Sequence, residues 1–163
     1  GGYSSGEIAG YSKAMHRYRM NKLISQMTAT IQNVRTFFST QRNYADLLSA
    51  GSGNNSLIKK AKLVPDDMID ANGHFQIEYG SAFNLIATTD KKENDTACLQ
   101  FKLEKDACID LLSYDWTDAN VKYINIEGLG TKYPPISIDD AVTYCEKHSA
   151  DPHIIDGFEF CFK

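Results

Sequence analysis

The sequence predicts an α+β domain in which a long N-terminal helix packs on an antiparallel sheet of four to five strands. Three patterns predict this class: helical spacing of apolar residues over 8–38, period-two alternation between residues 74 and 103, and two shorter helical patterns near the C-terminus. Strands that follow one another before the next helix favour an antiparallel sheet with helices on one face. The length of 163 residues suits a single domain, residues 1–163.

Residues 8–38 carry the strongest signal, because apolar side chains recur there mostly at spacings of three, four or seven. No Pro or Gly lies between Tyr11 and Ala50. A helix of about 30 residues is roughly 45 Å long, which is more than a domain of this size needs, so we expect a spine for assembly. The chain begins with Gly1-Gly2 and no initiator Met, which predicts a fragment or a processed product.

Alternation at period two predicts three strands, at 74–79, 82–89 and 96–103, which short polar turns join into an antiparallel meander. A connecting loop over 43–73 precedes them and contains a Gly/Ser/Asn-rich stretch at 51–56. Downstream, the sequence predicts a helix at 104–114, a strand at 121–126, a helix at 138–148 with Ser137 as its N-cap, and a closing strand at 157–162.

The net charge of −4 conceals an asymmetry between the predicted helix and the rest of the chain. Residues 1–42 hold six basic side chains against Glu7 alone, a net charge of +5, so the remainder carries −9. Three interpretations of the basic helix stay open: a solvated face, pairing with acidic surface on a neighbouring copy, and contact with nucleic acid or lipid headgroups. The acidic remainder would repel phosphate, so no nucleic-acid partner is expected.

Four cysteines lie at positions 98, 108, 145 and 161, and none forms a CxxC pair. An even number without metal-ligand spacing favours two disulfides and an oxidising compartment; zinc binding around Cys145 and His148, or reduced thiols, are the alternatives. Cys98 and Cys161 fall on the polar sides of predicted strands, where a neighbouring strand lies within the Cα reach of a disulfide. Cys108 and Cys145 fall on or near short helices. The favoured pairs among three pairings are Cys108–Cys145 and Cys98–Cys161.

In combination these segments resemble a type IV pilin, most closely the type IVb branch of the toxin-coregulated pilin and related enterobacterial pilins. Residues 8–47, from IAGYSKAM to NYADL, resemble the second half of the spine helix and its aromatic exit. The segments KDACIDLL and IDDAVTYC resemble those that bracket the disulfide-closed C-terminal region, which assigns its bond to Cys108 and Cys145. The last strand, GFEFCFK, matches the final sheet strand. The pair Cys98 and Cys161 departs from the single disulfide that is usual in that family.

The resemblance implies how the chain is divided and what precedes it. Residues 7–42 would be the C-terminal half of the spine helix, 43–73 a connecting loop, 74–103 the meander strands, and 104–163 the disulfide-closed region and closing strand. A hydrophobic half-helix upstream of Gly1 would anchor the precursor in the inner membrane and later lie in the fibre core. The membrane is expected as a partner only through that missing helix.

The function that the resemblance implies is a structural subunit of a bacterial type IV pilus. Copies would self-assemble into a helical surface filament with the help of the pilus assembly machinery in the inner membrane, and the outer surface would serve adhesion or bundling. A minor pilin or a pseudopilin of a type II secretion system is the alternative. The part of the helix that does not face its own sheet is expected to bury against neighbouring copies. The residues assigned to this assembly helix are Ile8, Tyr11, Met15, Tyr18, Leu23 and Met27.

No enzymatic activity and no cofactor are expected. The sequence holds none of the motifs HExxH, GxSxG, GxGxxG or the P-loop. His148, Asp151, His153 and Asp156 form an acidic cluster with imidazoles, which we interpret as solvated loop residues beside Pro152 and not as a metal or acid–base site. A secreted binding domain or small enzyme unrelated to fibres is the remaining class.

Overall fold

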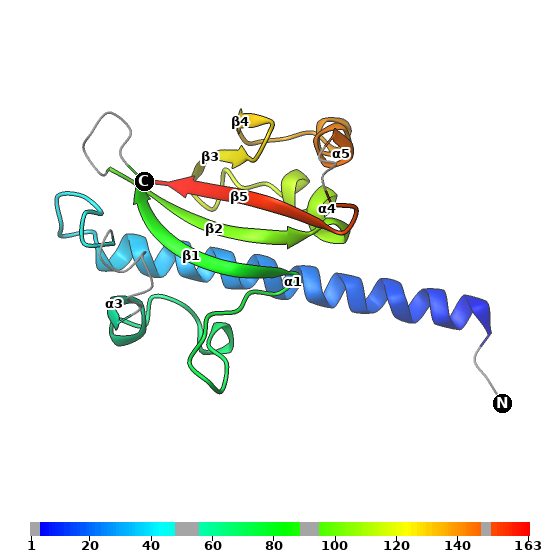
Figure 1. Cartoon of the computed structure of the whole chain (residues 1–163), viewed down its shortest axis with the longest axis horizontal. Coiled ribbons are helices and arrows are strands. Elements are labelled where there is room, and N and C mark those ends of the chain that lie inside the picture. Colours follow the sequence, from blue (N-terminus) through cyan, green and yellow to red (C-terminus); the bar gives the residue numbers. More distant parts are fainter. Residues whose placement is uncertain (1–3, 48–55, 89–94, 148–150) are drawn as a thin grey trace.

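The computed structural model describes residues 4–47, 56–88, 95–147 and 151–163, and it places the 33-residue helix α1 (Ser5–Phe37) along one side of the domain (Figure 1). The helix begins at a capping box, in which the Ser4 hydroxyl accepts the Glu7 N–H and the Glu7 carboxylate accepts the Ser4 N–H (3.1 Å). The predicted helix is confirmed, and this cap lets it begin before its first apolar residue. The predicted loop at 51–56 falls almost entirely outside the described residues.

Five antiparallel strands form one sheet in the spatial order β1-β2-β5-β3-β4. The predicted class, a long helix with an antiparallel sheet of four to five strands, is therefore confirmed. The C-terminal strand does not close an edge, because it lies between β2 and β3 in the middle of the sheet (Figure 1). The strands are β1 (Gly80–Thr88), β2 (Thr96–Glu104), β3 (Val121–Ile126), β4 (Gly130–Lys132) and β5 (Ile154–Phe162).

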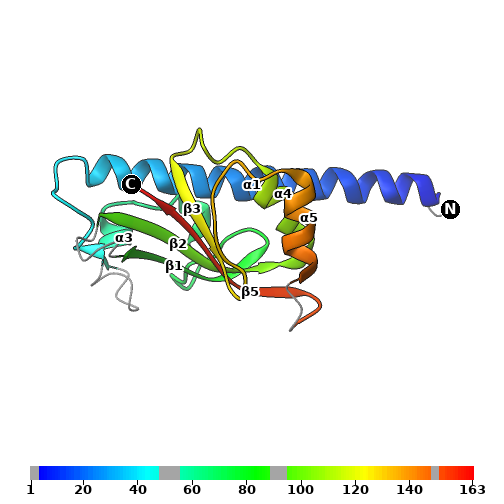
Figure 2. The same ribbon diagram turned by 90° about the horizontal axis from the view of Figure 1, so that it is seen from above.

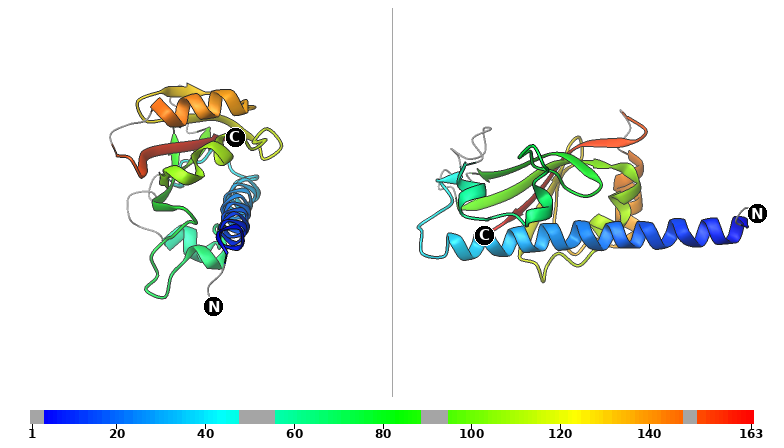
Figure 3. Two further views of the ribbon diagram at one scale, coloured as in Figure 1. Left: turned by 90° about the vertical axis from the view of Figure 1, so that its right-hand side faces the viewer. Right: turned by 90° about the horizontal axis from the view of Figure 1, so that it is seen from below.

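The two faces of the sheet differ in chemistry, and the strand register explains how. One row across four strands aligns Leu85, Leu99, Phe160 and Ile124, all of which are fully buried. This face packs toward α1, which covers it from one side in Figures 2 and 3. The helix supplies buried apolar side chains to the same core, from Met20, Leu23, Met27, Ile31 and Val34. The sheet and the C-terminal part of α1 therefore share one core.

Residues 74–79, predicted as a strand, instead form an irregular segment against α1. The Gln76 N–H donates to the Met68 carbonyl (2.8 Å), and the Glu78 N–H donates to the side-chain oxygen of Gln26 on α1 (2.8 Å). Only isolated bridges occur here, so the predicted three-strand meander is wrong and only β1 and β2 form its hairpin. Alternating burial is real in this segment, but an extended chain lying on a helix alternates as a strand does.

The connection between α1 and the sheet also carries the short helix α3 (Ser56–Lys60) and the 3-10 turn η1 (Asp66–Met68). Further along the chain, the 3-10 turn η2 (Lys105–Ala107) leads into α4 (Cys108–Ser113), and α5 (Ile138–Lys147) follows β4. Helices α4 and α5 lie together at one end of the sheet (Figure 1). The predicted helices at 104–114 and 138–148 are thus present, with His148 outside the described residues.

Two disulfides join these elements in the pairing that the sequence favours. Cys108–Cys145 links α4 to α5 with a Cα–Cα distance of 6.0 Å, and Cys98–Cys161 links β2 to β5 with a Cα–Cα distance of 4.1 Å. The predicted polar setting of Cys98 and Cys161 is wrong, because both are completely buried where β2 is covered on both faces. Since all four sulfurs are bonded, no thiolate remains for zinc.

Candidate functional site

The N-terminal end of α1 projects beyond the sheet and the C-terminal helices (Figures 1 and 3). Four large apolar side chains in the N-terminal half of α1 are exposed to solvent: Ile8 by 55%, Tyr11 by 68%, Met15 by 38% and Tyr18 by 63%. Soluble proteins rarely expose apolar side chains in a contiguous group unless the group binds something. We call these four residues the α1 seam.

The spacing of the α1 seam is that of a helix–helix contact. Its four residues are separated by three, four and three positions, which is the a/d pattern of two successive heptads. The core-facing stripe of Leu23 and Met27 lies on a different side of the helix, rotated by about 120° at roughly 100° per residue. The helix thus presents one apolar side to its own sheet and another to solvent.

Of the six residues assigned from sequence to an assembly helix, the structure separates two from the rest. Leu23 and Met27 are completely buried in the domain's own core, so neither can touch another copy while the domain is folded. Their helical spacing could not reveal this, because folding and assembly both require apolar side chains on a helix. The seam is therefore limited to the four exposed residues.

A polar clamp holds α1 at the point where it leaves the domain. The His16 ring lies 2.6 Å from the Tyr79 hydroxyl through Nδ1 and 2.6 Å from the Asp110 carboxylate of α4 through Nε2. The Arg19 guanidinium stacks on the Tyr79 ring, 3.8 Å from its centroid. We call His16, Tyr79 and Asp110 the α1 clamp. It fixes the projecting part of the helix to both the 74–79 segment and the disulfide-bonded helix α4.

Charges beside the α1 clamp reinforce it. Arg19 Nε donates to Glu78 (2.5 Å), and this hydrogen bond raises the pKa of Arg19 above its ordinary value. Burial raises the pKa of Tyr79, while the Arg19 charge opposes that increase. Lys22 also approaches Glu78, at 3.6 Å. Part of the basic helix is thus paired within its own domain, a use of its charge that the sequence interpretation did not consider.

The sequence interpretation missed the α1 clamp, although one signal was available. His16 lies seven residues before the buried Leu23, so two helical turns place it on the core-facing side of α1. A titratable residue in that position needs a polar partner, which the domain supplies from two other elements. Nothing in the sequence identified Tyr79 and Asp110 as those partners, because they lie 63 and 94 residues further along the chain.

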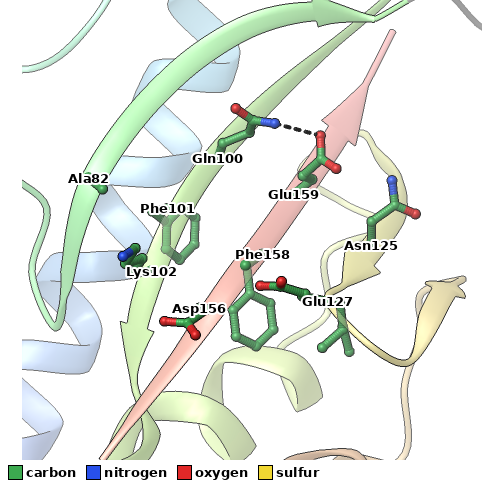
Figure 4. Close-up of a pocket in the computed structure, with 11 residues that line it drawn as sticks. Ala82, Gln100, Phe101, Lys102, Asn125, Glu127, Asp156, Phe158 and Glu159 are labelled. Atoms are coloured by element: carbon green, nitrogen blue, oxygen red, sulfur yellow. Dashed lines mark hydrogen bonds between the residues drawn. The ribbon is translucent and has the colours of Figure 1, made fainter. Parts of the chain in front are cut away.

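The sheet face opposite α1 carries a row of polar side chains. The register aligns Asn84, Gln100, Glu159 and Asn125 across β1, β2, β5 and β3. Gln100 donates to Glu159 (2.9 Å), as the dashed line in Figure 4 marks, and Thr131 on β4 donates to Asn125 (2.6 Å). The row therefore spans all five strands. We call it the outer polar row.

An open hollow of about 410 Å³ adjoins the outer polar row. Its lining residues come from β1, β2, β3 and β5 and from Glu127 directly after β3. Figure 4 shows among them the carboxylates of Glu127, Asp156 and Glu159 and the side chain of Lys102. The Glu127 carboxylate lies over Gly157, where a Cβ atom would come within 2.9 Å of it. The hollow presents hydrogen-bonding groups and a net negative charge to solvent.

The acidic cluster near the C-terminus is divided by the structure. His148 lies outside the described residues, while the His153 N–H donates to the Asp151 carboxylate (2.7 Å) as part of a turn. Asp156 lies in the hollow on the outer sheet face. The described members are therefore not gathered at one point.

The fold defines a class of protein: a domain whose helical spine extends beyond its own sheet and exposes apolar side chains there. Comparison with protein families assigns the chain within that class. The family model named Bundlin matches residues 13–160, and the chain belongs to this family. No curated protein and no solved structure matches the chain.

Bundlin is a type IV pilin family, so the protein is a structural subunit of a pilus at the cell surface. The resemblance to type IV pilins is confirmed, and membership of the type IVb branch stays a prediction. A pilin family also implies that copies assemble into a filament. Within the described residues, no helix combines the length and the hydropathy needed to cross a bilayer.

Proposed function

We propose that this pilin assembles through its α1 seam, which packs against helices of neighbouring copies in a type IVb-like pilus. The observation that carries the proposal is the a/d spacing of four exposed apolar residues on the part of α1 that its own domain leaves uncovered. Burial of each such side chain contributes about 1.5–3 kcal/mol. A contact between unlike surfaces whose rotation does not close into a ring continues from copy to copy as a filament.

The test is a double variant in the parent gene that combines Tyr11→Ser with Tyr18→Ser. We expect surface filaments to be lost while the protein is still made and disulfide-bonded, as judged by electron microscopy, shearing and non-reducing electrophoresis. Phe37→Ser is the matched control, because Phe37 is an aromatic residue of α1 that is 44% exposed outside the seam. Normal filaments in the double variant would contradict the proposal.

The outer sheet face would then point away from the filament axis, where adhesion or bundling takes place. Support comes from the position of the outer polar row and its hollow on the face opposite α1. Glu159→Gln with Asp156→Asn removes two charges from that face and leaves the seam intact. We expect filaments of normal length with reduced bundling or cell attachment. Unchanged attachment and bundling would remove this role from the outer face.

Two parts of the proposal concern what happens before and during assembly. The precursor would be held in the inner membrane by an apolar helical segment continuous with α1 and passed to the pilus assembly machinery there; the upstream gene sequence tests this. The subunit would be a major component of the fibre. Its share of the protein in sheared filaments separates this role from that of a minor pilin or a pseudopilin.

A further inference from the structure

A second surface on α1 lies almost opposite the α1 seam and faces α4. It is a groove of about 590 Å³ between the two helices. Its floor is apolar, from Met20 and Ile24, and its rim carries Lys13 and Arg17. Among the described residues, neither of these two cations has an ion pair, whereas Arg19 and Lys22 are paired with Glu78. We call this the α1–α4 groove.

The α1–α4 groove is not filled by its own domain. Asp110 lies at its edge, but the His16 ring already holds that carboxylate at 2.6 Å. Ile24 remains partly exposed although it packs against the core. An apolar floor with unpaired cations at the rim fits a partner that carries an apolar side chain next to carboxylates.

The chain itself carries such a segment in its acidic part, downstream of residue 42. In residues 133–140, Tyr133 is 71% exposed and Ile138 is 67% exposed, and Asp139 and Asp140 follow directly. Ile138 lies three residues before the buried Ala141 and seven before Cys145, so the apolar side of α5 continues past the core that it helps to form. No described residue forms an ion pair with either aspartate.

We propose that residues 133–140 of a second copy of this chain dock in the α1–α4 groove. Ile138 of that copy would lie on the floor formed by Met20 and Ile24, and its two aspartates would pair with Lys13 and Arg17. The charge of +5 on residues 1–42 and −9 on the remainder gives the same complementarity over the whole chain. The two surfaces differ, so the contact is heterologous and each copy can bind the next.

This contact rests on the proposed filament but uses residues that the α1 seam does not. The first experiment is a charge exchange in the native pilus, scored as pilin in the sheared fraction. Lys13→Glu with Arg17→Glu, and separately Asp139→Lys with Asp140→Lys, should each reduce that fraction by about tenfold or more. Combining all four substitutions should restore it to within about twofold of the parent. Glu146→Lys, at the exposed far end of α5, is the matched control and should have little effect.

The second experiment avoids the charge reversals, because Asp139 and Asp140 also favour the start of α5. A photoreactive p-benzoylphenylalanine replaces Ile138 in assembled pili, and illumination should join it to a peptide from residues 12–24 of another copy. Cross-links only to other regions, or no rescue in the fourfold variant, would overturn the groove contact. If the seam variants abolish filaments and the groove variants do not, the groove contact is wrong and the proposed function stands. A parent chain that forms no filament would remove both.

Discussion

The two parts of α1 belong to one continuous helix, yet only one of them is covered by its own domain. In residues 20–37, the side chains of Leu23, Met27 and Val34 are completely buried in the core that α1 shares with the sheet. Residues 5–19 expose Tyr11 and Tyr18 by more than three-fifths. The apolar spacing is helical in both parts, so what differs is the partner: the sheet of the same chain covers one part, and we propose that a second copy covers the other.

This difference separates stability from assembly within one helix. A buried apolar residue stabilises the single domain, whereas an exposed one contributes only when another surface covers it. The α1 clamp marks the boundary region, since His16 lies between the seam residues Met15 and Tyr18 and four positions before Met20, the first buried residue of α1. Substitutions on the two sides of this boundary should therefore act on different measurements.

The largest effect on folding is expected in the buried part. Leu23→Ala removes a completely buried side chain from the core that α1 shares with the sheet. Truncations of this kind cost about 3–5 kcal/mol, because the lost transfer free energy adds to that of the cavity. Urea unfolding of the purified chain, kept oxidised, measures this cost. A loss below about 1 kcal/mol would mean that residues 20–37 are not part of the cooperative core.

The next effect tests whether the C-terminal helices anchor the middle of α1. Cys108→Ser with Cys145→Ser opens a loop of 37 residues between α4 and α5. In the chain-entropy model this costs about 3–4 kcal/mol. Because Asp110 of α4 belongs to the α1 clamp, we also expect surface filaments to be lost. Cys98→Ser with Cys161→Ser is the matched control for disulfide loss away from α4; normal piliation without Cys108–Cys145 would contradict the anchoring role.

Much of the fold could be predicted from the sequence because the signals are local. The spacing of apolar residues located α1, and the segment VKYINI at 121–126, predicted as a strand, forms β3 with the same bounds. Ser137 was expected to cap α5, and its hydroxyl accepts the Asp140 N–H (3.1 Å). Each of these features depends on residues only a few positions apart.

What could not be predicted depends on contacts distant in sequence. The placement of β5 between β2 and β3 is set by pairing over more than thirty residues, as between Ile126 and Phe158, and over 63 residues between Cys98 and Cys161. The short strand β4 has a burial pattern without alternation, so it left no period-two signal. Burial alternates along 74–79 as predicted, but the backbone N–H groups of this segment donate to the Gln26 side chain and the Met68 carbonyl and not to a neighbouring strand. Alternation reports burial and does not identify the partner that provides it.

A smaller effect is expected from the α1 clamp itself. His16→Ala removes two hydrogen bonds, to Tyr79 and to Asp110, at about 1 kcal/mol each. Tyr79→Phe is the matched comparison, because it removes only the hydroxyl contact and should lose about half as much. Urea unfolding measures both, and amide exchange near residue 16 should increase in His16→Ala. Equal losses in the two variants would show that Asp110 adds nothing to the clamp.

The smallest effect on folding, and the largest contrast, belongs to the α1 seam. Tyr18→Ala on the purified chain should change the free energy of unfolding by less than about 0.5 kcal/mol, because 63% of the Tyr18 surface is already in water. In the assembled pilus the same side chain would be buried between helices, so there its removal should reduce the amount of filament. Urea unfolding and sheared pilin are measured on the same variant. A stability loss comparable with that of Leu23→Ala would place Tyr18 in the domain's own core and remove the distinction between the two parts of α1.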